Sequence, residues 1–184
     1  MISQQSSDSG PPQAEFDPGR PAASYVRVAI AVIQNPKLFY DNMPRRSGYQ
    51  APALFTLISF IIPGLAVTLI KQEPLALLLY LLLIGGWLIY VALLHLVATK
   101  FMAGQADFQG TFRAIAYTSF TSLIVFIPYL GLAAHLFGFY LAIYGLSSVH
   151  RLSIGQAALT LGVVIIFLIL INLMMAGSLV QQMS

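Results

Sequence analysis

The sequence predicts an all-α protein, a polytopic membrane helix bundle of five transmembrane helices preceded by a short interfacial amphipathic helix. Three observations predict this fold. Of the 184 residues, 58% are hydrophobic and only 8% are charged, whereas a soluble globular chain carries about 25% charged residues. Apolar runs long enough to cross a bilayer recur along the chain. The basic residues stand singly between these runs, which is typical of membrane loops and indicates no nucleic-acid partner.

Residues 1–22 are predicted to be a disordered tail. They are rich in Ser, Gln, Pro and Gly, a composition that cannot bury enough apolar surface to fold.

Residues 23–52 are predicted to form a cytoplasmic interfacial amphipathic segment. Asn35 and the proline after it are typical of the cap and first position of a second short helix in this segment. Packing of the segment on the protein's own core is the alternative. The apolar residues of its first helix follow helical spacing: Val26, Ala29, Ile30 and Ile33. Four basic side chains are candidate contacts for lipid headgroups: Arg27, Lys37, Arg45 and Arg46.

Residues 53–181 are predicted to form the membrane domain. A capping box, Ser153 with Gln156, marks the start of its last helix. The first span is interrupted by Pro63, which a membrane helix tolerates when neighbouring groups satisfy the freed carbonyl. The expected spans are about 53–70, 74–98, 114–127, 132–148 and 157–180.

The stretch between Arg113 and Arg151 determines the number of spans. It holds about 37 residues without Asp, Glu, Lys or Arg, roughly 55 Å as one helix, against a hydrocarbon core of about 30 Å. Pro128 and Gly131 supply a turn near its middle, so we expect a hairpin. A re-entrant hairpin that does not cross fully is the alternative, and it leaves both flanks on the same side.

Five spans place the termini on opposite sides of the membrane. With the N-terminus in the cytoplasm, every Lys and Arg except Lys71 lies on the inner side, as the positive-inside rule favours. A four-span arrangement places Arg151 outside and fits both length and charge less well. We therefore expect a cytoplasmic N-terminus and an outer C-terminus.

The fourth predicted span carries a face of small residues. Gly131, Gly138 and Gly145, with alanines between them, fall at intervals of three or four, which lets another helix approach closely. This face can serve internal packing, which we favour, or a homo-oligomer.

The polar residues inside the spans can be explained by helix packing alone. His95, His135, Asn172 and the hydroxyls around Ser119 and Ser122 can all serve helix packing through hydrogen bonds. There is no Cys and no hydrolase or phosphate-loop motif in the sequence. We therefore expect no catalytic residues, no cofactor, no metal and no enzyme activity.

Several motifs together resemble the Ypt-interacting protein (Yip) family of five-span membrane proteins. They are "NPKLFYDNMP" followed by "GYQAPALF", then "FRAIAYTSFTSLIVFIPYLG", then "YGLSSVHRLSIGQAAL", which cover most of residues 36–159. Eukaryotic members bind Rab-type GTPases through a longer cytosolic region with an Asp-Leu-Tyr-Gly-Pro motif. That motif is absent from this sequence, which puts Rab binding in doubt. The likeness is to prokaryotic members and implies the inner (plasma) membrane.

Two functions are compatible with these features. The first is a non-enzymatic protein that organises or shapes the membrane, or that acts as a scaffold for a membrane-protein partner. The alternative is a small transporter or its accessory subunit, which a polar path past Ser119, Ser122, His135 and Asn172 would support.

Overall fold

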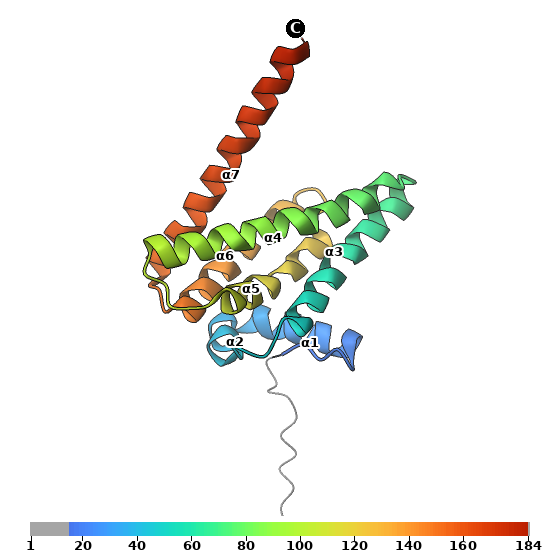
Figure 1. The fold of residues 1–184 in the computed structure, drawn as a ribbon. Helices are drawn as coiled ribbons and strands as arrows, with labels where there is room; N and C mark the ends of the chain where they lie inside the picture. The colour runs from blue at the N-terminus through green and yellow to red at the C-terminus, as the bar shows by residue number, and fades with distance from the viewer. Residues whose placement is uncertain (1–14, 184) are drawn as a thin grey trace, which may run out of the picture.

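The computed structural model describes residues 15–183, and all its regular elements are helices (Figure 1). Four helices, α3, α4, α6 and residues 154–176 of α7, are long and apolar enough to cross a membrane. The polytopic helical bundle is therefore confirmed. In chain order the elements are α1 (Pro21–Gln34), α2 (Pro36–Asn42), α3 (Gln50–Lys71), α4 (Leu75–Phe101), α5 (Phe108–Ala116), the 3₁₀ helix η1 (Ser119–Ile124), α6 (Leu130–His150) and α7 (Ile154–Met183).

Folded structure is already present before residue 23. Residues 1–14 of the expected tail lie outside the described residues, but residues 15–22 are placed, and α1 already starts at Pro21. Phe16 is buried, with its ring 5.8 Å from that of Phe55. Burying a side chain of this size stabilises the fold by about 1.5–3 kcal/mol, so one aromatic residue holds the end of a polar segment against the bundle.

We expected one continuous helix over residues 114–127, and the structure shows instead that the helix is interrupted in this segment. α5 ends at Ala116, a turn follows, and η1 continues the segment. The cause is a run of hydroxyls that each donate to the carbonyl three residues earlier, and these i−3 bonds favour the tighter 3₁₀ geometry over the α-helix. The residues are Thr118, Ser119, Thr121 and Ser122.

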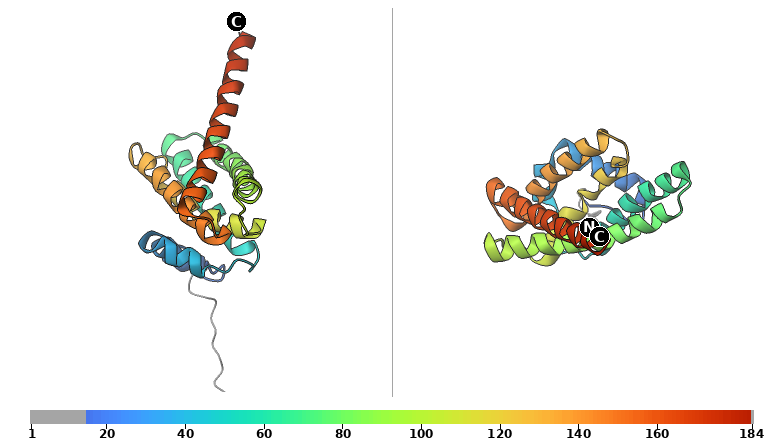
Figure 2. Two further views of the ribbon diagram at one scale, coloured as in Figure 1. Left: turned by 90° about the vertical axis from the view of Figure 1, so that its left-hand side faces the viewer. Right: turned by 90° about the horizontal axis from the view of Figure 1, so that it is seen from above.

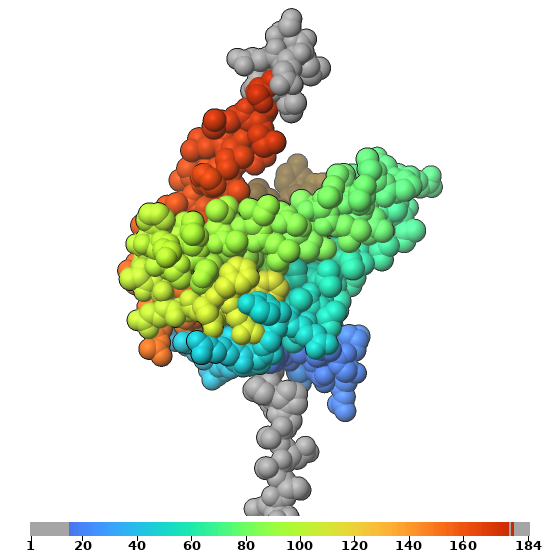
Figure 3. Space-filling model, viewed as in Figure 1, coloured from blue at the N-terminus to red at the C-terminus, as the bar shows by residue number. Residues whose placement is uncertain are grey.

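The two ends of the bundle differ in shape. We call the end that carries α1, α2 and the start of α5 the basal end, and the opposite end, with the α3–α4 turn and the η1–α6 turn, the distal end. α1 and α2 lie across the basal end in both side views (Figures 1 and 2). Towards the distal end α7 rises away from α4 and leaves a notch between them (Figure 3).

The core has two parts that meet at α5. One is rich in aromatic rings and joins α1, α2 and α3 to α6, while the other joins α4, α5, α6 and α7. Every residue from Gly110 to Ala116 is buried, so α5 is the central helix of the basal half.

α1 presents two apolar faces. Tyr25 stacks on Phe55 with ring centroids 4.3 Å apart, and Val28 and Val32 are fully buried beside it. The face expected from the sequence lies largely on the other side, where Ile30 is 46% exposed. The sequence did not reveal which face packs, because apolar residues occupy most of the circumference of this helix. The exposed apolar residues are Val26, Ile30 and Ile33.

Candidate functional site: a hollow in the distal half

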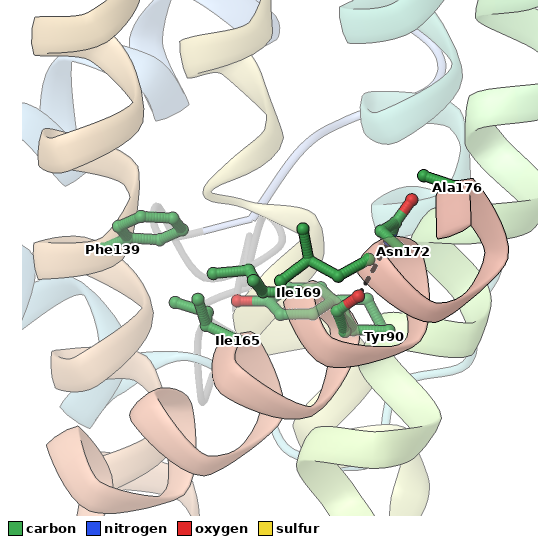
Figure 4. Close-up of a pocket in the computed structure, with 8 residues that line it drawn as sticks. Tyr90, Phe139, Ile165, Ile169, Asn172 and Ala176 are labelled. Carbon is green, nitrogen blue, oxygen red and sulfur yellow. Dashed lines mark hydrogen bonds between the residues drawn. The ribbon is translucent and has the colours of Figure 1, made fainter. Parts of the chain in front are cut away.

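Two adjoining cavities lie in the distal half of the bundle. The inner cavity, of about 520 Å³, lies between α3, α4, η1 and α6. The outer cavity, of about 610 Å³, lies between α4, α6 and α7 (Figure 4). Tyr90, Phe139 and Leu168 line both cavities, so the two adjoin. We call them together the distal hollow.

The floor of the inner cavity is made of the η1 hydroxyls. Ser122 Oγ lies 2.7 Å from the carbonyl oxygens of both Ser59 and Ser119. Ser119 Oγ lies 2.6 Å from the carbonyl oxygen of Ala116. Each hydroxyl has one proton, and a carbonyl takes it, so the hydroxyl oxygens remain as hydrogen-bond acceptors.

The floor is linked to α1 by further hydroxyls. Ser119 Oγ lies 3.1 Å from Ser59 Oγ, which lies 2.7 Å from Tyr25 Oη. Tyr25 belongs to the basal end, so this chain of hydrogen bonds connects the floor of the hollow with a helix of the other half.

The walls are aromatic and aliphatic with few polar atoms. Trp87 and Tyr90 come from α4. His135 Nδ1 lies 3.0 Å from the carbonyl oxygen of Gly131, and because a carbonyl only accepts, Nδ1 donates this hydrogen bond. Asn172 donates to the carbonyl of Leu168, one turn back on its own helix, at 2.8 Å (Figure 4).

The polar candidates from the sequence are thus partly brought together. Ser119, Ser122 and His135 line the inner cavity, and Asn172 lines the outer cavity. His95 lies elsewhere, at the basal end of α4.

The turn and the glycines of α6 hold it close to the segment before it. Pro128 lies in the turn, where its carbonyl accepts from Leu130 N at 2.7 Å. A Cβ on Gly131 would overlap the carbonyl oxygen of Val125. A Cβ on Gly138 would lie 3.0 Å from Thr121 Oγ1, and one on Gly145 would lie 3.2 Å from Ala114 Cβ and 3.3 Å from Tyr40 Cε1. All three glycines therefore face other segments of the same chain, namely α2, α5, η1 and Val125 at the end of η1.

A histidine pair at the basal end was missed in the sequence. Ala106 N donates to His150 Nδ1 at 3.3 Å, so the proton of His150 is on Nε2, which lies 2.7 Å from Thr111 Oγ1. Thr111 Oγ1 in turn lies 2.9 Å from His95 Nδ1. The contacts join the ends of α4, α5 and α6. His150 lies in the motif YGLSSVHRLSIGQAAL, but no signal in the sequence linked it to His95.

A buried ion pair was also missed. The Arg113 guanidinium, fully buried, binds the carboxylate of Glu15 and donates to the carbonyl of Gly48 at 2.7 Å. Ser47 Oγ donates to the same carboxylate at 3.1 Å. The pair joins α5 to Glu15, at the start of the described residues, and its signal in the sequence was only that Arg113 precedes a long stretch without Asp, Glu, Lys or Arg.

The four candidate headgroup contacts lie exposed at the basal end. Two make ion pairs within the chain, Lys37 with Asp41 at 2.6 Å and Arg46 with Asp107 at 2.9 Å. The other two, Arg27 and Arg45, donate to the carbonyl oxygens of Glu15 and Ser148 at 3.2 and 3.1 Å. All four still reach the solvent or a bilayer surface.

Two acidic side chains at this end have lowered pKa values. The Lys37 hydrogen bond holds the pKa of Asp41 below its ordinary value, and Ser148 adds to this. For Asp107 the main cause of the lowered pKa is the Gly110 backbone N–H, followed by Arg46. Within residues 15–183 no group of three His, Cys, Asp or Glu lies close enough together to hold a metal ion.

The sequence of this chain matches one known protein family. No curated protein and no solved structure matches the chain. A family model described as the Yip1 domain matches residues 30–176, which covers α3, α4, α5, η1 and α6 completely. With its apolar membrane-length helices, this is a multi-pass integral membrane protein. The chain belongs to the Yip1-domain family, as the resemblance of its motifs predicted.

Proposed function

We propose that this protein is a non-enzymatic membrane organiser that occupies more of one leaflet than of the other. The observation that supports this is the unequal distribution of the chain along the bundle. α1 and α2 lie across the basal end alone, while α7 rises away from the other helices at the distal end (Figures 1 and 2). Short helices that lie in the interface of one leaflet displace lipid from that leaflet and so favour curvature.

The surface of the basal end supports contact with lipid. The exposed residues of α1, Val26, Ile30 and Ile33, together with Leu38 of α2, form what we call the apolar stripe. An apolar stripe beside exposed basic side chains is typical of a helix that lies in the membrane interface. Basic groups near an anionic leaflet each add about 1 kcal/mol of attraction.

The proposal places the basal end in the cytoplasm of a prokaryotic cell. The basic residues except Lys71 belong to segments of that end, and Lys71 ends α3 at the opposite side. Because the chain has no cysteine, single cysteines can be labelled with an impermeant thiol reagent in intact cells. A cysteine replacing Ser184 should react, and one replacing Gln105 or Ser153 should not. Labelling at Ser153 from outside would contradict this orientation.

The bilayer role is tested with the full chain in anionic vesicles. Mean vesicle diameter, measured by electron cryomicroscopy, should fall as the protein-to-lipid ratio rises. Ile30→Glu with Ile33→Glu should abolish the effect, because carboxylates in the stripe oppose insertion. Gln34→Glu adds an exposed charge off the stripe and serves as the control. A parent protein that leaves vesicle diameter unchanged would overturn the proposal.

Transport is the second candidate function. The observation that favours it is the chain of hydroxyls from Ser119 through Ser59 to Tyr25, which starts in the hollow and ends in the basal half. The test is proton flux in vesicles loaded with a pH-sensitive dye. A flux that disappears in Ser59→Ala would support this candidate, and a parent flux equal to that of empty vesicles would exclude proton transport.

A further inference from the structure

We infer that the distal hollow is a binding site for a neutral lipid alcohol, a molecule with apolar chains and one uncharged hydroxyl, of which diacylglycerol is the simplest membrane example. The inference is independent of the bilayer-organising role. It concerns what the hollow holds, and three features of its lining lead to it.

The first feature is the absence of charge. No Asp, Glu, Lys or Arg is among the residues that line either cavity in the described chain. The Arg113 guanidinium binds Glu15 at the basal end and is fully buried there. A phosphate or an ammonium group in the hollow would have no counter-charge, which is costly in a membrane interior. The ligand's polar group is therefore neutral.

The second feature is the excess of acceptors at the floor. The protons of Thr121 and Ser122 are directed to backbone carbonyls 3.0 and 2.7 Å away, which leaves the hydroxyl oxygens as acceptors. Such a floor is satisfied by a ligand that donates a hydrogen bond. An alcohol donates, whereas an ester or a quinone only accepts. This selects a hydroxyl over a carbonyl as the polar end.

The third feature is the direction of the hollow. The hydroxyls lie at the inner cavity, and the outer cavity is lined mainly by apolar side chains of α7 such as Ile165, Ile169 and Leu173 (Figure 4). These helices carry exposed apolar residues around the outer cavity, so acyl chains can leave between them into the bilayer. An amphiphile therefore enters with its polar end first.

Space in the inner cavity depends on a glycine. A Cβ added to Gly86, which lines the cavity, would meet nothing within 4 Å, and the same is true of Gly85, which does not line it. Leucine at either position faces no clash at its Cβ and raises helix propensity equally. Only the leucine at position 86 fills the cavity, so the two variants are a matched pair.

The chain carries its own reporter for this site. Trp87 is the only tryptophan and lines the inner cavity. The full-length protein in phosphatidylcholine nanodiscs is mixed with one of three lipids that share the same brominated chains, whose bromines quench tryptophan fluorescence. The lipids are diacylglycerol, its acetyl ester, which has no hydroxyl, and phosphatidic acid, which is charged.

Diacylglycerol should quench Trp87 at the lowest mole fraction. The acetyl ester should need about 2–10-fold more, the worth of one hydrogen bond, and phosphatidic acid more than about tenfold more. Gly86→Leu should remove these differences, and Gly85→Leu should keep them. Equal quenching by the three lipids, or an unchanged preference in Gly86→Leu, would overturn the inference.

Discussion

The basal end and the distal half of this bundle bond their polar groups differently. At the basal end, side chains from distant segments bond to each other, as Arg113 does to Glu15 and as His150 does to His95 through Thr111. In the distal half, polar side chains bond mostly to their own turn, as Asn172 does to the carbonyl of Leu168. Bonds between distant segments fix the segments relative to each other, whereas bonds within one helix leave its neighbours free to diverge.

Packing follows the same division. Aromatic rings from α1, α2, α3 and the end of α5 contact one another at the basal end. The ring centroids of Phe39 and Phe55 lie 5.4 and 5.2 Å from the ring centroid of Tyr117. In the distal half the side chains of α7 beyond its first turns are largely exposed. The contacts that stabilise the fold are therefore concentrated at the basal end, and the surfaces open to lipid are in the distal half. Substitutions at the basal end should lower stability more than substitutions in the distal half.

Breaking the buried ion pair should give the largest effect on stability. Glu15→Ala leaves the Arg113 guanidinium buried without a counter-charge, and the free energy of unfolding should fall by about 3–5 kcal/mol. Unfolding in mixed detergent micelles, followed by circular dichroism, measures this loss.

Two further variants make that measurement specific. Arg46→Gln breaks an exposed pair and should change stability little. Glu15→Ala combined with Arg113→Met removes both charges and should recover much of the loss. A Glu15→Ala protein as stable as the parent would show that the contact between Glu15 and Arg113 does not stabilise the basal end.

Gly138→Leu should give the next largest effect and extends the comparison to the distal half. The leucine side chain would overlap Thr121, because Thr121 Oγ1 lies only 3.0 Å from the position of a Cβ on residue 138. Overpacking of this kind lowers the free energy of unfolding by about 1–3 kcal/mol. His135→Ala, three residues away and exposed, is the control and should cost much less. Thermal unfolding in detergent compares the two. A Gly138→Leu protein as stable as the parent would mean that α6 and η1 can separate freely.

The sequence predicted the regular spans because length and hydropathy alone determine them. α3, α4, α6 and α7 lie close to the expected ranges, and the hydrogen bonds of the Ser153–Gln156 capping box are present. Local chemistry that depends on neighbouring residues can be recognised in this way, and so can the Asn35 cap, which accepts from Leu38 N at 3.0 Å.

What the sequence did not predict depends on contacts between distant residues. Glu15 and Arg113 are 98 positions apart, and nothing in either neighbourhood indicates the other. The break at η1 had a local signal in its run of hydroxyls, but helix packing was an equally good explanation for them. The hollow also depends on how neighbouring helices diverge, so the sequence indicated its polar lining, as at Ser119, Ser122 and Asn172, but not the cavity itself.

Tyr25→Phe should give a smaller effect and tests the link between the two halves. The ring keeps its stacking on Phe55, while the hydroxyl that bonds Ser59 is lost. The expected cost is about 0.5–1.5 kcal/mol. Tyr129→Phe, at a side chain that is 91% exposed, is the control. Hydrogen exchange of η1 that rises in the first variant alone supports coupling of α1 to the floor, and no change in η1 would place the two halves in independent units.

The pH dependence of stability should give the smallest effect, and it should separate the two halves. The pKa values of Asp41 and Asp107 are lowered in the folded protein, so their contribution is present above the ordinary Asp value of about 3.9 and is lost as the pH falls through the lowered values. Both side chains are about 40% exposed, and screening by solvent keeps the contribution small. Between pH 6 and pH 3 the Tm of the parent should therefore fall slightly more than that of a variant with Asp41→Asn and Asp107→Asn.

Quenching of Trp87 by the brominated lipid alcohol should stay the same in both proteins, because neither carboxylate lines the distal hollow. Equal loss of Tm in the two proteins would show that these carboxylates contribute nothing, and a change in quenching would show that the basal end controls the hollow.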